Sequence, residues 1–344
     1  MTDNKRFAIY GATGYTGRQV ASEVAWRGLV PVLIGRDRAK LEAVADGIAD
    51  SEVRVADLDD SAALRASLDE SAAVINCAGP FSTTAVAVIA AAMDAGCHYV
   101  DCTAEQEAVV DAFERWDVPA REQGLAVVPA MGYFGALGDL LVTVTAEGVE
   151  KIEQVTVAHA IENWRPTTGS LATAHEMAAE RHAWRGNQLE LVEGDPRFSS
   201  FEYPAPLGQA QVLEDYPLPE AVVVPRHLET PEVRALMTAS TVQEVFSTDA
   251  TMASAISDAD RAASRFVIVA VVGDGTNEHR STLKGADIYG ITAPIVVEAA
   301  VRLAHSDRFG AVAPGEAFRP REFLACLEAR GLELEMNPAQ EVAL

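Results

Sequence analysis

The 344-residue chain is poor in cysteine and in lysine. Its four cysteines show neither a Cys-x-x-Cys spacing nor a nearby histidine pair, which excludes a zinc ribbon and a disulfide framework. We therefore expect no metal site and four buried free thiols, at Cys77, Cys97, Cys102 and Cys326. Only four lysines occur, so Lys40, which follows a predicted strand, stands out as a phosphate-binding candidate.

Long apolar runs are also missing. The longest run, residues 85–95, falls short of the roughly 20 residues that a membrane-spanning helix requires, so no membrane span is predicted. The polar start, residues 1–6, leads directly into an expected strand and leaves no room for the apolar core of a signal peptide. These two features predict a cytoplasmic protein.

Positive charge is in short supply, because 27 Lys and Arg residues face 51 Asp and Glu residues, a formal net charge of -24. A phosphate backbone would be repelled by such a surface, which argues against a nucleic-acid partner and leaves a small-molecule substrate. With 49% apolar residues and no low-complexity tract, the composition indicates a globular protein. The length favours two hydrophobic cores.

The first half of the chain alternates between short apolar strands and helix-like segments. This alternation predicts a parallel sheet covered on both faces, the doubly wound α/β architecture. In such sheets ligands bind at the carboxyl ends of the strands, so the loops that follow the strands become candidates. We expect strands at 7–10, 30–34, 53–56, 73–76, 98–101 and 125–130, with helices at 18–27, 38–48, 61–68, 83–95 and 106–123.

A glycine-rich turn joins the first strand to the first helix. Gly11, Gly14 and Gly17 form Gly-x-x-Gly-x-x-Gly, which lets the backbone approach a diphosphate while the helix start favours the anion. The alternative is a purely structural strand-to-helix turn, but the place after the first strand of the alternation favours a dinucleotide site. Hydroxyl donors in the same loop are Thr13, Tyr15 and Thr16.

The end of the second strand selects the form of the dinucleotide. Enzymes that use NAD typically carry an acidic residue there, which accepts from the ribose 2'-hydroxyl, whereas this chain has Arg36, with Arg38 and Lys40 close behind. A guanidinium pairs well with a 2'-phosphate, so the sequence predicts NADP(H). The alternative for Arg36 is a solvated surface charge. Asp37 either accepts from the ribose or caps the next helix.

Two later loops are further cofactor candidates. Asp57 follows the third strand. The segment after the fourth strand consists of small residues and a Gly-Pro turn, which suits a backbone that runs close beside ribose or nicotinamide, although packing alone would also explain it. Its candidate residues are Cys77, Ala78, Gly79, Pro80 and Phe81.

Several motifs taken together resemble the saccharopine dehydrogenase-like family of NADP-dependent reductases, which includes trans-acting enoyl reductases. They are Gly11–Gly17, Gly35–Asp37, Asn76–Phe81, His98–Asp101 with Thr103–Glu105, and further on Trp164–Ser170, Pro225–Leu228 and Gly310–Phe318. The resemblance implies a Rossmann-type NADP-binding domain formed by residues 1–135 and 290–344, with a returning C-terminal helix. It also implies an inserted α+β substrate and dimerisation domain with a mixed sheet at 136–289, and we hypothesise a homodimer.

The resemblance implies an oxidoreductase that transfers a hydride to a small organic substrate. The family reduces imines formed from amino acids and, in other members, enoyl groups, so we expect C=N reduction with C=C reduction as the alternative. A catalytically silent NADP-binding sensor or scaffold is the alternative of another class. Short-chain dehydrogenases start with similar glycine loops, but no tyrosine here has the lysine four residues on that their chemistry uses.

Candidate catalytic and substrate residues lie in the second half. Tyr133 follows the sixth strand, and the resemblance alone favours Arg226 and His227. Thr168, Gly169 and Ser170 begin an expected helix at 171–184, where free N–H groups suit an anionic substrate, but a plain helix cap is equally economical. His159, His175 and His182 are further candidates for the acid, but a single histidine on an apolar helix, as expected for His175 and His182, is more often packed or solvent-facing than catalytic. We also expect a helix at 135–146, a strand at 155–161, a hairpin of 265–272 with 280–286, and a helix at 289–303.

Overall fold

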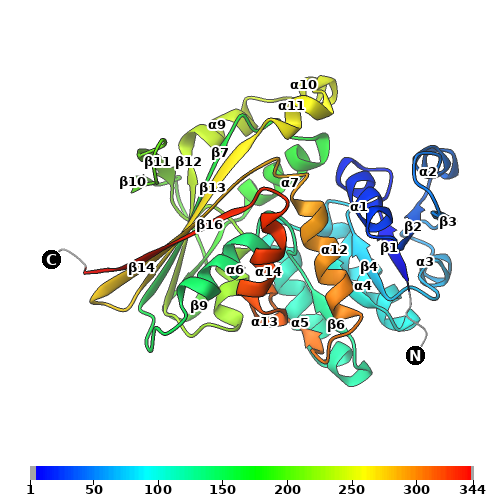
Figure 1. Ribbon diagram of the computed structural model, residues 1–344, viewed down its shortest axis with the longest axis horizontal. Coiled ribbons are helices and arrows are strands. Elements are labelled where there is room, and N and C mark those ends of the chain that lie inside the picture. The colour runs from blue at the N-terminus through cyan, green and yellow to red at the C-terminus, as the bar shows by residue number, and fades with distance from the viewer. Residues whose placement is uncertain (1–4, 342–344) are drawn as a thin grey trace. The chain divides into compact units, whose positions relative to one another are not determined.

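The computed structural model describes residues 5–341, which divide into two compact units. The first unit holds residues 5–103, then Glu107–Gly132 and Thr292–Val312. The second unit holds Ala104–Gln106, Tyr133–Ile291 and residues 313–341. Figure 1 traces the elements of each unit along the chain. Within residues 5–341 no helix has both the length and the apolar character that crossing a membrane requires.

The first unit is built on a seven-stranded parallel sheet in the order β15-β6-β5-β4-β1-β2-β3. Its central strands are short apolar runs whose residues are nearly all buried, as expected where helices cover both faces. This confirms the doubly wound α/β class. The strands are β1 (Arg6–Tyr10), β2 (Val30–Gly35), β3 (Glu52–Val55), β4 (Ala73–Asn76), β5 (His98–Asp101), β6 (Ala126–Val128) and β15 (Gly310–Ala311).

Helices connect these strands in the predicted alternation. They are α1 (Tyr15–Trp26), α2 (Arg38–Ala45), α3 (Ser61–Ser67), α4 (Phe81–Ala95), α5 (Gln106–Gln123) and α12 (Thr292–Leu303). Helix α12 packs beside α1 and against β4 and β5, so a late segment of the chain completes the first unit (Figure 1). Arg27 at the end of α1 donates to Glu298 of α12 at 2.5 Å, which fixes the two helices together.

The chain reverses direction across the sheet between β1 and β4. From β1 it runs outward through β2 and β3, and from β4 it runs the other way through β5 and β6. The loops after β1 and β4 therefore flank the topological switch point, which is where doubly wound sheets bind their ligands. The fold thus brings together two of the loops that the sequence singles out.

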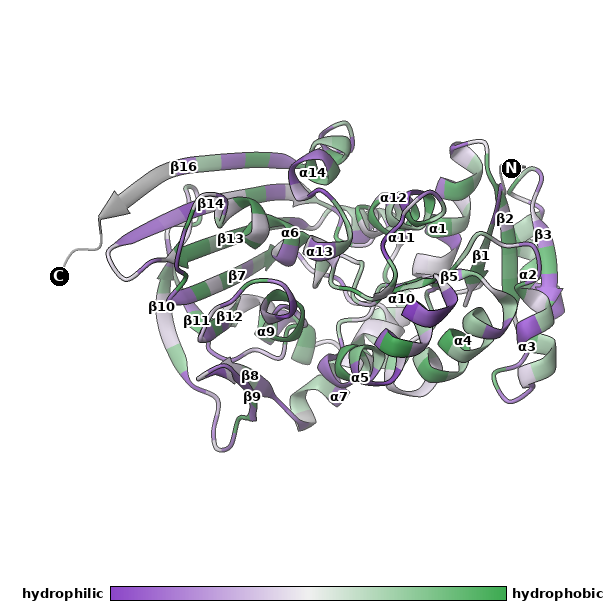
Figure 2. Cartoon of the chain, turned by 90° about the horizontal axis from the view of Figure 1, so that it is seen from below, coloured by the Kyte–Doolittle hydropathy of each residue, from purple (hydrophilic) through white to green (hydrophobic). Residues whose placement is uncertain are grey.

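The second unit contains a mixed sheet in the order β10-β11-β12-β7-β13-β14-β16, with the hairpin of β8 and β9 paired to β12. Only β7 and β12 run parallel, and the other described pairs are antiparallel. Figure 2 shows β7 and β13 mostly in the hydrophobic colour and much of β14 in the hydrophilic one. The strands are β7 (Gln154–Glu162), β8 (His182–Arg185), β9 (Gln188–Leu191), β10 (Phe198–Glu202), β11 (Gln209–Leu213), β12 (Glu232–Thr238), β13 (Arg265–Gly273), β14 (Asn277–Ala286) and β16 (Glu333–Glu341).

The helices of the second unit are mostly short. They are α6 (Ala136–Thr145), α7 (Thr168–Ala179), α8 (Glu220–Val223) with the 3-10 turn η1 (Val224–Arg226), α9 (Ala239–Phe246), α10 (Ala250–Ala255), α11 (Asp258–Ala262), α13 (Pro314–Ala317) and α14 (Pro320–Glu328). Helix α6 packs against β13 and β14. All ten of its positions except Thr143 are buried, so α6 forms the centre of this unit.

One predicted helix is wrong in its second half. The sequence predicts a helix over 171–184, but α7 ends at Ala179 and His182–Arg185 form β8. Gly186 and Asn187 both have positive φ, at 57° and 64°, and such a pair makes the tight turn of a β-hairpin. Pairing with β9 and β12 therefore overrides the local helical pattern.

The end of the chain also differs from the expected division. Residues 290–344 were expected in the first domain, but only Thr292–Val312 join the first unit and the chain from Ala313 on joins the second. The reason is packing, because α14 buries Phe323, Leu324 and Leu327 and contacts α6. Strand β16 then pairs with β14 at the edge of the mixed sheet.

Candidate functional site

Two of the three loop glycines are required by the protein's own packing. Gly11 has a φ of +81°, and a Cβ there would lie 2.9 Å from the Cβ of Ala78. A Cβ at Gly17 would meet the carbonyl oxygen of Gly11 at a distance that real atoms do not reach. Gly11 therefore brings the loop close to the segment after β4, and Gly17 brings the helix close to the loop.

Gly14 has no such structural explanation. It is exposed, has an ordinary φ of −70°, and a Cβ there would have one protein atom within 4 Å, the Gly11 oxygen at 3.3 Å. It is also the N-cap of the 12-residue α1, and no side chain caps this helix or places a carboxylate in its first turn. The start of α1 therefore suits an anion, and the open side of Gly14 lets one approach. A dinucleotide diphosphate fits this arrangement.

The end of β2 presents an unpaired guanidinium. Arg36 is exposed and forms no ion pair among residues 5–341, whereas Lys40 lies 3.6 Å from Asp37 and Arg38 lies 3.6 Å from Glu42. The carboxylate of Asp37 caps α2 and accepts from the backbone N–H of Lys40 at 3.1 Å. Of the two alternatives for Asp37, the helix cap is therefore the one that the structure contains. Arg36 stays available for a phosphate.

Charged groups from three strand ends gather near Tyr10, the last residue of β1. Burial raises the pKa of the Tyr10 phenol, the negative charge of Asp57 raises it further, and the positive charge of Arg36 partly offsets both. Asp57 is exposed and accepts from the N–H of Asp59 at 3.2 Å. A cation and a carboxylate are thus both available at the carboxyl ends of β1, β2 and β3 for the polar groups of an adenosine.

A buried polar network supports the loop after β4. The side-chain oxygen of Asn76 accepts from the N–H of Ala78 at 3.0 Å, and its amide donates to Tyr99 at 3.2 Å. The Tyr99 hydroxyl donates to Asp101 at 2.8 Å, and the other Asp101 oxygen accepts from Ala130 N–H at 2.8 Å. The sequence signal for this network is the presence of polar residues at the ends of apolar strands, but their pairing was not predicted.

The five candidate residues 77–81 lie directly after β4, next to this buried network. Cys77 and Ala78 are half-buried, Gly79 is exposed, Pro80 caps α4 and Phe81 is the buried first residue of that helix. Because the network fixes Ala78, the loop holds its shape beside the glycine turn.

Two of the four cysteines, Cys77 and Cys97, lie in surroundings that keep the thiol protonated. A hydrogen bond with Cys102 and burial raise the pKa of Cys77 well above its ordinary value, and burial raises the pKa of Cys97 to about 12. A thiol that keeps its proton is a poor nucleophile. The expectation of four buried thiols is confirmed for Cys97 alone, because Cys77 and Cys102 are half-buried and α14 turns Cys326 outward, where it is exposed.

In the second unit, Tyr133 belongs to a buried polar chain of side chains. Its hydroxyl lies 3.4 Å from Nδ1 of His159, and Nε2 of His159 lies 2.9 Å from Oε1 of Glu220. Oε1 of Glu220 also accepts from the N–H of Gly135 at 3.2 Å. His159 and Glu220 are fully buried and Tyr133 is 3% exposed. The sequence singled out Tyr133 but gave Glu220 no role.

His227 also pairs with a buried carboxylate of the second unit. Its Nε2 lies 2.7 Å from Oδ1 of Asp139, and Oδ2 of Asp139 accepts from Gly315 N–H at 2.7 Å. A Cβ at Gly315 would lie 2.8 Å from the His227 ring, so glycine is required there. This pairing gives His227 a structural role that ties η1 and α13 to α6. Arg226 is exposed at the end of η1.

The predicted substrate loop is partly a helix cap. Thr167 caps α7 by accepting from the N–H of Ser170 at 3.0 Å. The hydroxyl of Ser170 lies 2.8 Å from that of Tyr289, which also accepts from the indole N–H of Trp164 at 3.0 Å. These bonds fix the start of α7. The exposed residues left for a ligand are Thr168 and Gly169.

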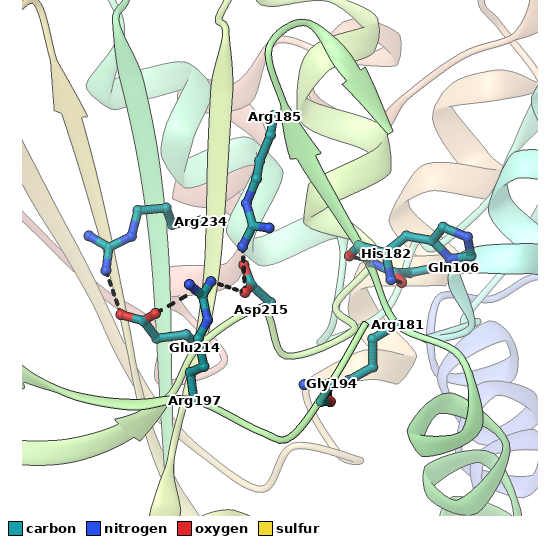
Figure 3. Close-up of polar contacts among 9 residues, drawn as sticks. All are labelled: Gln106, Arg181, His182, Arg185, Gly194, Arg197, Glu214, Asp215 and Arg234. Atoms are coloured by element: carbon teal, nitrogen blue, oxygen red, sulfur yellow. Dashed lines mark hydrogen bonds and ion pairs between the residues drawn. The ribbon is translucent and has the colours of Figure 1, made fainter. Parts of the chain in front are cut away.

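An arginine cluster on the mixed sheet is neutralised from within (Figure 3). Arg185 and Arg197 both donate to Asp215 Oδ2, at 2.5 and 2.7 Å, and Arg234 donates to Glu214 at 3.2 Å. Because each guanidinium has a carboxylate partner, this cluster stabilises the strands around β11 and offers no ready anion site.

The His227 pair predicts a pH-dependent stability. Burial lowers the pKa of His227, but the charge and hydrogen bond of Asp139, helped by Glu316, outweigh it and raise the pKa above its ordinary value. The stabilising contribution of His227 is thus complete below the unfolded-state pKa and is lost as the pH rises through the folded-state pKa. We expect the free energy of unfolding in urea to fall by about 1–3 kcal/mol above roughly pH 6.5.

Two variants test this assignment. His227→Gln keeps a donor but does not titrate, so it should flatten this part of the pH profile. The exposed His305→Gln should leave the profile as in the wild type. An unchanged slope in His227→Gln would contradict the assignment.

Comparisons with known proteins agree with this geometry. The family model described as the saccharopine dehydrogenase NADP-binding domain matches residues 7–128. A lipid droplet localized protein of Caenorhabditis elegans is 31% identical over 144 residues, 38% of this chain and 34% of that protein. A saccharopine dehydrogenase-like oxidoreductase of Bos taurus is 27% identical over 155 residues, 40% of this chain and 36% of that protein.

A trans-acting enoyl reductase of Mycobacterium ulcerans is 28% identical over 138 residues, 38% of this chain and 33% of that protein. The chain thus matches about a third of the length of each of these three curated relatives.

The solved structure of saccharopine dehydrogenase (L-Glu forming) from Saccharomyces cerevisiae aligns with 98% of this chain and 100% of that chain, at a TM-score of 0.64 and 13% identity. This likeness shows that the two chains share a fold. The match of residues 7–128 to the NADP-binding family model confirms both the family resemblance and the NADP(H) cofactor predicted from the sequence.

Proposed function

We propose that this protein is an NADP(H)-dependent oxidoreductase that reduces a small organic substrate. The observation that carries the proposal is the start of α1, where no side chain caps the helix and the side of Gly14 is open. The curated relatives named as oxidoreductase and enoyl reductase support the proposal.

Each group of residues in the first unit has a separate binding role. The backbone of residues 11–17, with the hydroxyls of Thr13, Tyr15 and Thr16, holds the diphosphate. Arg36 binds the 2'-phosphate, and Arg38 and Lys40 add positive charge nearby. Asp57 accepts from adenosine hydroxyls, and residues 77–81 form the wall beside the ribose and nicotinamide. When bound, NADPH supplies a hydride.

The reduction also needs a proton unless the acceptor carries one already. We assign Tyr133 as the proton donor, Arg226 as a second catalytic candidate, and the exposed Thr168 and Gly169 as substrate contacts. Burial and the charge of Glu220 raise the pKa of Tyr133 well above its ordinary value, so its hydroxyl stays protonated at neutral pH. Reduction of an imine remains the first choice, since a protonated iminium can accept a hydride without any acid from the protein.

Reduction of an enoyl group is the second candidate. The name of the Mycobacterium ulcerans relative favours it, and protonation of carbon requires a donor such as Tyr133. A cytoplasmic location and a homodimer belong to the same proposal. A non-catalytic NADP sensor is the alternative of another class.

The proposal is tested by following NADPH oxidation with panels of imines, enoyl thioesters and keto acids. An enzyme should oxidise NADPH in the presence of compounds from one panel and show little oxidation with compounds from the other two. NADPH binding without turnover on any panel would instead support the sensor.

We expect Gly14→Val to weaken NADPH binding without unfolding the protein. A side chain there fills the open approach to the helix start, and a steric cost of about 3 kcal/mol corresponds to a loss of about 100-fold in affinity. Fluorescence titration with NADPH measures the change. Gly47→Val is the matched control, because Gly47 lies after α2 and a Cβ there meets only the Val44 oxygen at 3.7 Å. Full affinity in Gly14→Val would refute the diphosphate assignment.

Arg36→Asp should discriminate between the two nicotinamide dinucleotides. Loss of a charged hydrogen bond costs about 1.5–3 kcal/mol, so NADPH affinity should fall by about 10- to 100-fold or more, while NADH affinity is kept or improved. Titrations with both dinucleotides measure this, and the exposed Arg65→Asp serves as control. Equal losses of affinity for NADPH and NADH would contradict the assignment of the 2'-phosphate to Arg36.

A further inference from the structure

We propose that His159 and Glu220 form a buried proton relay that reloads the hydroxyl of Tyr133 during the reduction. The inference rests on the proposed function, because it names how that reaction receives its proton. Tyr133 is the group that meets the substrate, whereas His159 and Glu220 act through Tyr133 as positioning residues.

The relay is a continuous chain of polar atoms from three elements of the second unit. Tyr133 precedes α6, His159 lies within β7, and Glu220 is the first residue of α8. The joining distances are 3.4 Å from Tyr133 Oη to Nδ1 and 2.9 Å from Nε2 to Glu220 Oε1. The rings of Phe134 and Phe266 pack against Tyr133. In so apolar a setting, the protonation state of one group strongly affects the hydrogen bonds of the next group in the chain.

Glu220 determines which nitrogen of His159 carries the proton. A carboxylate at Oε1 selects the tautomer with hydrogen on Nε2, which leaves Nδ1 to accept from the Tyr133 hydroxyl. When His159 gains a proton, Nδ1 becomes a donor to Tyr133 Oη instead. The hydroxyl hydrogen is then free to point away from His159.

The proton balance of the transfer is simple. As the O–H bond of Tyr133 breaks toward the substrate, the N–H bond at Nδ1 breaks and a new O–H bond forms at Tyr133. His159 returns to its neutral form beside the Glu220 carboxylate. One proton from solvent then recharges His159, so each turnover consumes one proton.

Stability alone does not explain this pair. Oε2 of Glu220 is buried and has no hydrogen-bond partner within residues 5–341, a situation that costs about 1–3 kcal/mol. Gly138 must also lack a side chain, because a Cβ there would lie 2.7 Å from Cγ of Glu220. Apolar residues of similar volume usually fill such a position at a lower free energy.

Tyr203 is a further titratable group that faces the relay. Its hydroxyl donates to the backbone oxygen of His159 at 3.0 Å, which leaves both ring nitrogens of His159 to the relay. Burial, then the charge of Glu220, then Tyr203 raise the pKa of Tyr133. Within β12 and β13, the strands beside β7, His159 is paired with Met237 and Ile268, which carry no charge.

Nitrogen-15 NMR of the histidine rings tests the relay without any substrate. The chain has seven histidines, and His159→Gln identifies the resonances of His159. We expect hydrogen on Nε2 in the wild type, a shift of the Nδ1 resonance in Tyr133→Phe, and a mixture of tautomers in Glu220→Gln. A His159 ring that responds to neither substitution would overturn the relay.

Kinetics with the substrate found in the panel give the second test. His159→Gln and Glu220→Gln should lower kcat by about 10-fold or more, leave KM and NADPH affinity unchanged, remove the basic limb of the pH profile and raise the solvent isotope effect. His279→Gln, at a surface pair 4.0 Å from Asp274, should behave as the wild type. Thermal melting of each variant verifies folding.

The outcomes separate the two proposals. Wild-type kcat and pH profile in both variants would overturn the relay and leave the reductase standing. Failure of the wild type to bind NADPH would overturn the reductase, and the NMR result would be unaffected.

Discussion

The N–H groups at the start of α1 are the constraint on which the rest of the site depends. Every helix begins with backbone donors that lack an intrahelical acceptor, and most helices satisfy some of them with a side chain. In this protein α2, α3 and α7 do so through Asp37, Asp60 and Thr167, whereas α1, like α4 and α6, does not. Because β1 delivers this uncapped start to the switch point of a parallel sheet, the fold presents a ready anion site where a dinucleotide binds.

The candidate polar groups of the second unit are buried in its interior, whereas those of the first unit lie at the carboxyl ends of its strands. Helix α6 carries or adjoins two buried histidine–carboxylate pairs, one through Asp139 and one through Glu220. Each pair is made possible by a glycine, Gly315 beside His227 and Gly138 beside Glu220. The first pair satisfies both carboxylate oxygens and ties elements together. The second leaves one oxygen unsatisfied, and this difference is why we assign chemistry to Glu220 and a structural role to His227.

Prediction from sequence succeeded where the signal is local. The Gly-x-x-Gly-x-x-Gly turn, the short apolar strands β1 to β6 and the basic residue at the end of β2 can all be recognised within a few neighbouring residues. It failed where a partner is distant in sequence. Strand β15 has only two residues and forms beside β6, and β8 is held by β9 and β12. His159 and Glu220 are 61 residues apart, and no periodicity relates them.

The sequence by itself determined the doubly wound fold of the first unit, the dinucleotide loop and the preference for NADP(H), because glycine conformation, strand hydrophobicity and side-chain charge are properties of short segments. The tertiary structure alone decided that Asp37 caps a helix, that Arg36 forms no ion pair within residues 5–341, that residues 313–341 join the second unit and that Tyr133, His159 and Glu220 lie in one chain of contacts. These outcomes depend on which distant segments pack together, since a hydrogen bond or ion pair forms only when folding brings both partners within a few ångströms.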